Sequence, residues 1–191
     1  MNRAGARPRI SAWLLDRPVV AAFDRAVDRR FDALRALPTV DRVMYALSEL
    51  GDFSLIWHTG SVAWGLFGGP QGERAMLRLS GALAVEAAVV NGPIKSAFGR
   101  SRPTLEATRT NTLRQPMTSS FPSGHASAAA CAAILVADRR HPFTSLVVGA
   151  LATAVSVSRV HVRIHHGSDI IGGAIMGATF ALLVRRAVPL R

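Results

Sequence analysis

Three polar clusters stand out in an otherwise apolar chain, and their residues are of the types that bind and transfer phosphate. They read Lys95-x6-Arg102-Pro103, Pro122-Ser123-Gly124-His125 and Ser158-Arg159-x5-His165-x3-Asp169. Lysine and arginine bind phosphate oxygens, and the arginine fork can bind two of them at once. Histidine can act as a nucleophile or an acid, and aspartate can orient it. The clusters therefore predict a site for phosphoryl transfer.

The cations of these clusters are expected to hold the phosphate. Lys95, Arg102 and Arg159 would supply three fixed positive charges. Lys95 is the single lysine of a chain with 22 arginines. Either this position requires a compact ammonium group, or a coding bias toward arginine has left one lysine by chance. Ser123 and Gly124 stand where an apolar segment begins, and backbone N–H groups at the N-terminus of a helix bind anions.

The two histidines and the aspartate are expected to carry the chemistry. His165 and Asp169 are four residues apart and would share one helix face if a helix begins there. The Asp169 carboxylate would fix the tautomer of His165 and leave its other ring nitrogen free to attack phosphorus. His125, when protonated, could give its proton to the leaving oxygen. Two histidines and an aspartate could instead bind zinc, but three neighbouring cations would oppose this, so we expect neither a metal nor another cofactor.

Four further charged residues lie near the clusters. Glu86 falls inside an apolar segment, nine residues before Lys95, which is about 13 Å along a helix. We expect it to hydrogen-bond to another helix or to be protonated, rather than to bind the phosphate. Arg100, Arg109 and Arg114 belong to the polar stretch that precedes the second cluster. They are interpreted as solvated loop charges that could steer anionic headgroups.

The three clusters together resemble the three-part motif of the type 2 phosphatidic acid phosphatases, the PAP2 superfamily. All eleven specified positions match, in the expected order and at the ends of apolar segments. The resemblance covers residues from about 53 to 184. It implies a membrane enzyme that dephosphorylates a lipid phosphate or diphosphate through a phosphohistidine on His165, without a metal. It also implies that Asp169 orients His165, that His125 acts as acid and then activates water, and that the remaining motif residues bind phosphate.

The elements that must position these clusters are apolar helices. Hydrophobic residues make up 49% of the 191 residues and charged residues 18%, with a mean hydropathy of +0.25; an ordinary soluble chain is about a quarter charged. The apolar segments cover residues 53–69, 76–98, 121–137, 143–160 and 167–184. Eighteen helical residues span about 27 Å of a hydrocarbon core of roughly 30 Å. We therefore predict an all-α, multi-pass transmembrane bundle of about five spans, with the loops after the second and fourth spans on one side, where all three clusters can meet.

A basic region, residues 1–52, precedes the predicted catalytic domain at 53–184, and a basic tail follows at 185–191. In the N-terminal region, apolar residues recur every three or four positions over 20–37 and again over 40–47. This pattern is typical of amphipathic helices, which would lie at the interface or pack on the membrane domain. Lipid phosphatases of the family often have six spans, and this region is too charged to supply the first, which leaves the side of the membrane that the active site faces open.

The function expected from these residues is hydrolysis of a lipid phosphate or diphosphate in the cell membrane. Phosphatidic acid, phosphatidylglycerol phosphate and polyprenyl phosphates all fit. Two alternatives stay open: phosphotransfer to an acceptor other than water, and lipid-phosphate binding without catalysis. The net charge of +11 does not indicate a nucleic-acid partner, because the charges flank apolar segments and only 6% of residues are aromatic. The expected partners are the lipid phosphate and membrane lipids, and glycine-rich helix faces would permit a homo-oligomer.

Overall fold

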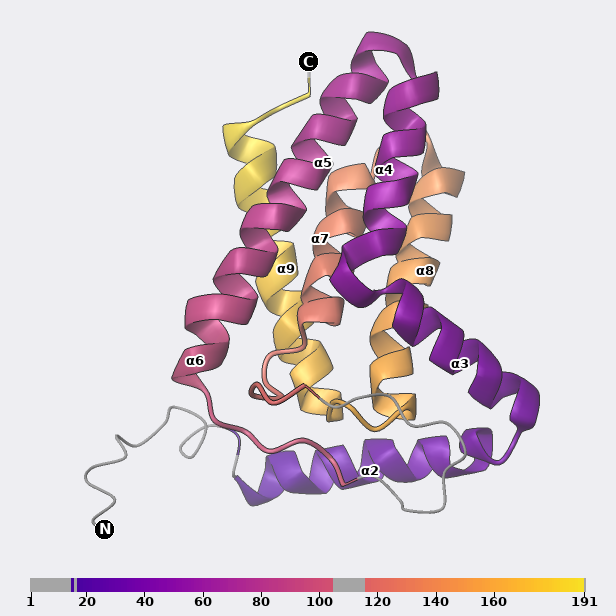
Figure 1. Ribbon diagram of the computed structural model, residues 1–191, viewed down its shortest axis with the longest axis vertical. Coiled ribbons are helices and arrows are strands. Elements are labelled where there is room, and N and C mark those ends of the chain that lie inside the picture. Colours follow the sequence, from indigo (N-terminus) through magenta and orange to yellow (C-terminus); the bar gives the residue numbers. More distant parts are fainter. Residues whose placement is uncertain (1–14, 16, 105–115, 191) are drawn as a thin grey trace.

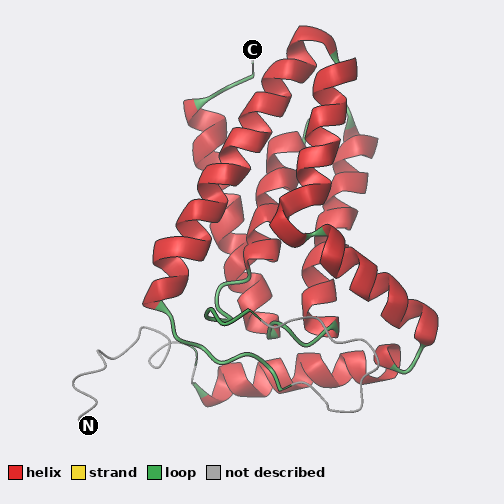
Figure 2. Ribbon diagram, in the orientation of Figure 1, coloured by secondary structure: helices red, strands yellow, loops and turns green. Residues whose placement is uncertain are grey.

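The computed structural model describes residues 15, 17–104 and 116–190, and within these ranges its regular elements are all helices (Figures 1 and 2). In chain order they are α2 (Pro18–Arg35), α3 (Pro38–Leu50), the 3-10 turn η1 (Asp52–Ser54), α4 (Leu55–Phe67), α5 (Gly69–Val89), the π-helical turn η2 (Val90–Ile94), α6 (Lys95–Ala97), α7 (Gly124–Val136), α8 (Pro142–His161) and α9 (Gly167–Ala187). The predicted all-α class is confirmed.

Helices α4, α5, α7, α8 and α9 stand side by side as a bundle, and successive helices run in opposite directions (Figure 1). The end of the bundle at which α5 and α8 stop is therefore the end at which α7 and α9 begin. This arrangement brings the segment after α5 and the turn after α8 together. The alternation of apolar segments had predicted this meeting of the three clusters.

Helices α7 and α9 pack backbone against backbone through glycine. Gly173 and Gly177 on α9 face the carbonyl oxygens of Ser123 and Ser127, and a Cβ at either glycine would overlap the oxygen that it faces. Small residues allow such close approach between membrane helices. The contact fixes the beginning of α7 against the beginning of α9, where two of the three motifs lie.

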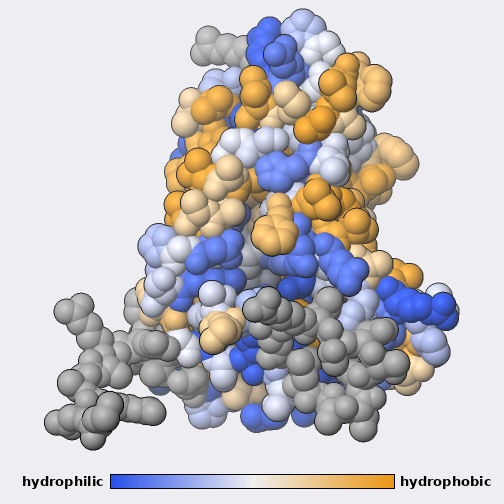
Figure 3. All heavy atoms as spheres, in the orientation of Figure 1, coloured by the Kyte–Doolittle hydropathy of each residue, from blue (hydrophilic) through white to orange (hydrophobic). Residues whose placement is uncertain are grey.

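Three helices of the described chain are long and apolar enough to cross a bilayer. They are Gly69–Ala97, which joins α5, η2 and α6, and then α8 and α9. Helix α7 is apolar but has 13 residues, and α4 also has 13, which is about 20 Å of helix against a core of roughly 30 Å. All five predicted segments thus lie in the bundle, and three of them have the length of a full span. Apolar side chains cover much of the outer surface of the bundle in the view of Figure 3.

The N-terminal helices pack on the bundle. Helix α2 lies across the end where α8 stops and α9 starts, and α3 leads from it to η1 (Figure 1). Arg35, the last residue of α2, donates from Nε to the carbonyl of His161 and from Nη2 to the carbonyl of Val160, both at 2.9 Å. These bonds satisfy the last carbonyls of α8, which a helix leaves without internal partners.

Candidate active site

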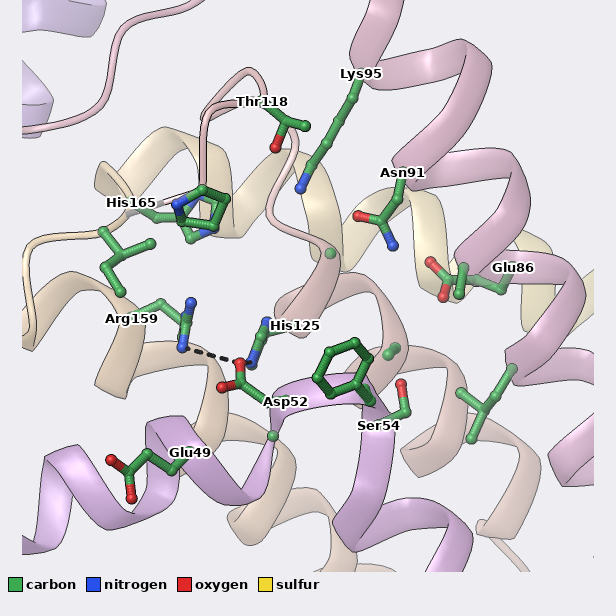
Figure 4. A pocket seen from close by; sticks show the side chains of 18 of the residues that line it. Glu49, Asp52, Ser54, Glu86, Asn91, Lys95, Thr118, His125, Arg159 and His165 are labelled. Carbon is green, nitrogen blue, oxygen red and sulfur yellow. Dashed lines mark ion pairs between the residues drawn. The ribbon is translucent and has the colours of Figure 1, made fainter. Parts of the chain in front are cut away.

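A cavity of about 970 Å³ opens at this end of the bundle, and six of the eight predicted site residues line it. They are Lys95, Arg102, Gly124, His125, Arg159 and His165. Figure 4 shows Lys95, His125, Arg159 and His165 pointing toward a common space. The other two predicted residues, Ser123 and Asp169, are buried behind the lining. Segments that are far apart in the sequence therefore meet in one polar cavity of an apolar bundle.

The predicted nucleophile and its orienting carboxylate are neighbours. His165 Nδ1 lies 3.5 Å from Asp169 Oδ2, and Asp169 is fully buried. The spacing of four had predicted one shared helix face, but α9 begins at Gly167. His165 instead stands in the turn before α9 and faces the third residue of that helix.

His165 is a neutral imidazole in this setting. Burial lowers its pKa to about 3 from an ordinary 6.5, and the contact with Asp169 offsets this only in part. A neutral ring is the nucleophilic form of histidine. Because Nδ1 faces the carboxylate, Nε2 is the nitrogen left to attack.

Arg100 is not the solvated loop charge that the sequence predicted. Its side chain is 8% exposed; Nη1 donates to Asp169 Oδ1 at 2.6 Å and Nη2 donates to Asp24 Oδ2 at 2.5 Å. Burial alone would lower the pKa of Arg100, but the two carboxylates more than offset this and raise it. Arg100 therefore ties the carboxylate behind the nucleophile to α2. The prediction was wrong because Asp24 precedes Arg100 by 76 positions, on the charged face of an amphipathic helix.

Lys95 reaches the cavity because the helix that carries it changes direction. Pro93 lacks an N–H group, and Gly92 has a non-helical ψ of −105°, so α5 gives way to the π-helical turn just before Lys95. The buried Lys95 side chain then points from α6 into the cavity (Figure 4). The single lysine of the chain thus lies where the phosphate site was predicted.

Arg102 and Arg159 are held in place by oxygen acceptors of the protein. Arg102 donates from Nη1 to the carbonyl of Ile164 at 2.9 Å, and the same nitrogen lies 3.5 Å from His165 Nε2. Burial lowers the pKa of Arg102, but a guanidinium group stays charged in proteins. Arg159, in the last turn of α8, is buried and donates from Nη1 to the hydroxyl of Ser48 on α3. Both cations are therefore positioned beside the cavity by the fold itself.

The beginning of α7 offers backbone amides to an anion. Ser123 is the N-cap; its hydroxyl accepts a bond from the third helical amide at 3.4 Å, and its own N–H donates to the Asp169 carbonyl at 3.0 Å. The amides of Gly124 and His125 lie between the Ser123 N–H and the amide that donates to the Ser123 hydroxyl. A helix leaves such first-turn N–H groups without internal partners. A Cβ at Gly124 would lie 2.7 Å from Asn91 Oδ1, so a larger residue there would displace the Asn91 side chain. The expectation that the Ser123 N–H binds the anion was wrong, because that N–H is buried and bonded to the Asp169 carbonyl.

Sequence reasoning missed several polar residues that line the cavity: Glu49, Asp52, Ser54, Asn91 and Thr118. Asp52 Oδ1 lies 2.9 Å from His125 Nε2 and 3.7 Å from Arg159 Nη1 (dashed lines in Figure 4). The contact with His125 lowers the pKa of Asp52, Arg159 lowers it further, and partial burial opposes them without prevailing, so the carboxylate is ionised. One signal was available in the sequence: Asp52 is the acid directly before the first apolar segment.

Of the remaining charged candidates, one lines the cavity and bonds to a neighbouring helix, and two cannot be placed. Glu86 is 1% exposed, and the hydroxyl of Ser127 on α7 donates a hydrogen bond to its Oε1; the expected bond to another helix is confirmed. Arg109 and Arg114 lie outside the described residues. Among the residues that are described, no three His, Cys, Asp or Glu side chains gather as a metal site would require.

The chain is similar in sequence to one family and to curated phosphatases. The family model described as PAP2 superfamily matches residues 75–191. Phosphatidylglycerophosphatase B of Bacillus subtilis is 34% identical over 76 residues, which is 35% of this chain and 37% of that protein. Decaprenylphosphoryl-5-phosphoribose phosphatase of Mycolicibacterium smegmatis is 32% identical over 143 residues, 74% of this chain and 75% of that protein.

Two solved structures share the fold. A transmembrane PAP2-type phosphatidylglycerolphosphate phosphatase from Bacillus subtilis has a TM-score of 0.68 at 24% identity, over 93% of this chain and 90% of that one. LpxE of Aquifex aeolicus has a TM-score of 0.71 at 18% identity, over 91% of this chain and 98% of that one. The family model covers more than half of the chain, the phosphatase from Mycolicibacterium aligns with 74% of it, and the motif residues line one cavity; this chain is a membrane phosphatase of the PAP2 superfamily.

Proposed function

We propose that this enzyme hydrolyses the phosphate monoester or diphosphate of a membrane lipid through a phosphohistidine on His165. The observation that carries the proposal is the buried, neutral His165 beside Asp169, in a cavity that also holds three cations and a second histidine. A phosphoryl group in this cavity meets a nucleophile, an acid and charge stabilisation together.

Two chemical steps follow from this arrangement. In the first, His165 Nε2 attacks phosphorus and the bond to the leaving oxygen breaks, while His125 gives its proton to that oxygen. The lipid leaves as an alcohol, or as a monophosphate if the substrate is a diphosphate. In the second, the neutral His125 takes a proton from water, the resulting hydroxide attacks phosphorus, and the P–N bond breaks. Inorganic phosphate and neutral His165 are released, with Asp169 facing Nδ1 throughout.

Lys95, Arg102 and Arg159 stabilise the charge of the transferring group in this mechanism. Negative charge on the three non-bridging oxygens is stabilised most by cations that are fixed before the reaction begins. The amides at the start of α7 add partial positive charge on the same cavity. Because the chain itself supplies this charge, we propose that hydrolysis requires no metal ion.

The substrate is proposed to keep its tail in the bilayer while its phosphate enters the cavity. Phe53 lines the cavity and is 97% exposed, which offers an apolar surface beside the polar site. The two curated relatives are named for phosphatidylglycerophosphate and for decaprenylphosphoryl-5-phosphoribose. We propose a substrate of this general type, a phosphatidic acid, phosphatidylglycerol phosphate or polyprenyl phosphate or diphosphate, in the plasma membrane.

The test is phosphate release by the purified full chain in detergent with EDTA, over a panel of lipid phosphates and polyprenyl diphosphates. We expect release from at least one class and its loss in His165→Ala. His141→Ala is the matched control, because His141 is an exposed histidine at the beginning of α8, at the far end of the bundle. Substantial turnover by a folded His165→Ala variant would overturn the mechanism, and loss of all activity in EDTA would overturn metal independence.

The same assay separates the two alternatives. A phosphorylated His165 that loses its phosphoryl group only when an alcohol acceptor is added, with formation of the phosphate ester of that alcohol, would indicate a phosphotransferase. A lipid phosphate that binds and is recovered unchanged would indicate a binding protein without catalysis.

A further inference from the structure

The η1 turn places a carboxylate against the proposed acid. Asp52 belongs to none of the three motifs, yet its Oδ1 lies 2.9 Å from His125 Nε2 and 3.7 Å from Arg159 Nη1. In Figure 4 the His125 ring lies between Asp52 and the space into which Lys95 and His165 point. Asp52 therefore stands behind His125 much as Asp169 stands behind His165.

The backbone around Asp52 is shaped to bring it there. Gly51 packs so closely that a Cβ would lie 2.6 Å from His125 Cδ2. Phe53 and Ser54 then adopt left-handed φ angles of 52° and 58°, which are unfavourable for residues other than glycine. Such a backbone persists only where its surroundings hold it, and functional sites are a common place for it.

His125 lies among cations, and the Asp52 carboxylate opposes their effect on the ring. Burial disfavours a positive charge on the ring, Arg159 from α8 and Lys95 from α6 oppose it further, and Arg102 lines the same cavity. Nearby cations disfavour a protonated imidazole, and a carboxylate in contact favours it. The other titratable groups that line the cavity are Glu49, His58, Glu86 and His165. Asp52 is the carboxylate in contact with the ring, so it offsets the cations that the phosphate site needs.

We propose that Asp52 is the positioning residue of the acid step: its carboxylate, beside Nε2, favours the protonated form of His125 and leaves Nδ1–H for the leaving oxygen. The inference rests on the function proposed above. Nδ1 gives its proton to the leaving oxygen as the P–O bond breaks, and the ring becomes the neutral tautomer that keeps Nε2–H. The same Nδ1 then takes a proton from the attacking water. Asp52 stays ionised and neither gives nor takes a proton.

The test is the pH dependence of kcat/KM for Asp52→Asn, measured on the full chain in detergent with the best lipid phosphate and with p-nitrophenyl phosphate. This ratio reports the steps through loss of the leaving group, which contain the acid step but not hydrolysis of the phosphoenzyme. We expect the basic limb to move to lower pH by about one to three units. At pH 8, lipid phosphate turnover should fall by roughly 100-fold. The aryl phosphate should fall much less, because its leaving group needs little protonation.

Two further variants separate positioning from structure. Asp52→Glu keeps the charge and should return the basic limb toward its wild-type position. Glu73→Gln removes the same charge from an exposed site near the beginning of α5, at the far end of the bundle, and should leave the profile unchanged. If Asp52→Asn does not fold, Asp52→Ser removes the same charge with a smaller side chain.

The outcomes distinguish this inference from the proposed function. An equal fall on both substrates with an unmoved basic limb, or no fall at all, would overturn the role of Asp52 and leave the phosphatase mechanism standing. Failure of the wild-type chain to release phosphate from any lipid in the panel would overturn the proposed function, and the inference with it.

Discussion

Asp24 is expected to govern stability and activity although it lies outside the active-site cavity. Its side chain is 6% exposed and accepts from Arg100 Nη2 at 2.5 Å. It also accepts from the backbone N–H of Ser168 at 2.8 Å and from the Ser168 hydroxyl at 2.9 Å. One carboxylate on α2 therefore holds both the loop of the first motif and the beginning of α9.

The substitution Asp24→Ala removes one partner of a buried ion pair and the acceptor of an amide in the first turn of α9. Loss of one member of a buried pair costs about 3–5 kcal/mol, and loss of a helix cap about 1 kcal/mol. Because Asp169 still faces Arg100, we expect a total near the lower end, roughly 3–4 kcal/mol. At about 2–4 °C per kcal/mol for a chain of this size, the Tm should fall by roughly 6–16 °C. Looser placement of Asp169 and His165 should lower kcat by roughly 10- to 100-fold.

Thermal unfolding of the purified chain in one detergent at one pH measures this effect. Asp32→Ala is the matched control: Asp32 also lies on α2 and pairs with Arg35 Nη1 at 2.8 Å, but its side chain is 55% exposed, and exposed pairs contribute less than about 1 kcal/mol. The reasoning is refuted if Asp24→Ala lowers the Tm no more than Asp32→Ala does. Asp24→Asn keeps a hydrogen-bond acceptor but not the charge, so its decrease in Tm should be intermediate between those of Asp24→Ala and Asp32→Ala.

Helix packing, pH and the buried carboxylate of α5 can each be probed by one further measurement. Gly177→Ala should lower the Tm, since its Cβ would overlap the carbonyl of Ser127, whereas Gly149→Ala should not, because nothing lies within 4 Å of a Cβ there. Between pH 6.5 and about 3 the unfolded chain protonates His165 and the folded chain does not, so the free energy of unfolding should decrease as pH falls through this window. A Tm series against pH checks this, and an equally steep decrease in His165→Asn would contradict it. Ser127→Ala removes the hydrogen bond to the buried Glu86 and should cost about 1–3 kcal/mol of unfolding free energy; an unchanged Tm would show that the bond contributes little.

The grouping of the predicted site residues was predictable because they are concentrated in short motifs at the ends of apolar segments. Lys95, Arg102, His125, Arg159 and His165 line one cavity, since alternating helix directions bring those ends together. The positions of the helix ends were less predictable, because apolar composition continues through residues that are not helical. Residues 121–123 precede α7 and Ala137 follows it, which leaves that helix with 13 residues rather than the 17 of the apolar segment.

The partners behind the site were not predictable, because each depends on a contact between distant segments. Asp24 looks like any other charge on the polar face of an amphipathic helix, and Arg100 looks like any other charge in a polar loop. They meet only because α2 lies across the end of the bundle (Figure 1). Nothing in the periodicity of a helix marks which of its charges will be buried, so the prediction of a solvated Arg100 followed a sound rule and was still wrong.

The N-terminal helices belong, in our proposal, to the catalytic unit and do more than attach the chain to the membrane surface. They place Asp24 beside Arg100, Ser48 beside Arg159 and Asp52 beside His125. A chain that began at the predicted domain boundary, residue 53, would keep every residue of the three motifs and lose all three of these contacts. Arg159 and His125 would then lack the groups that orient them, and Arg100 would lose one of its two carboxylates. Fixed geometry is what makes charge effective in a transition state. The motifs determine which reaction is possible, while α2, α3 and η1 hold the reacting groups in the arrangement that the reaction requires.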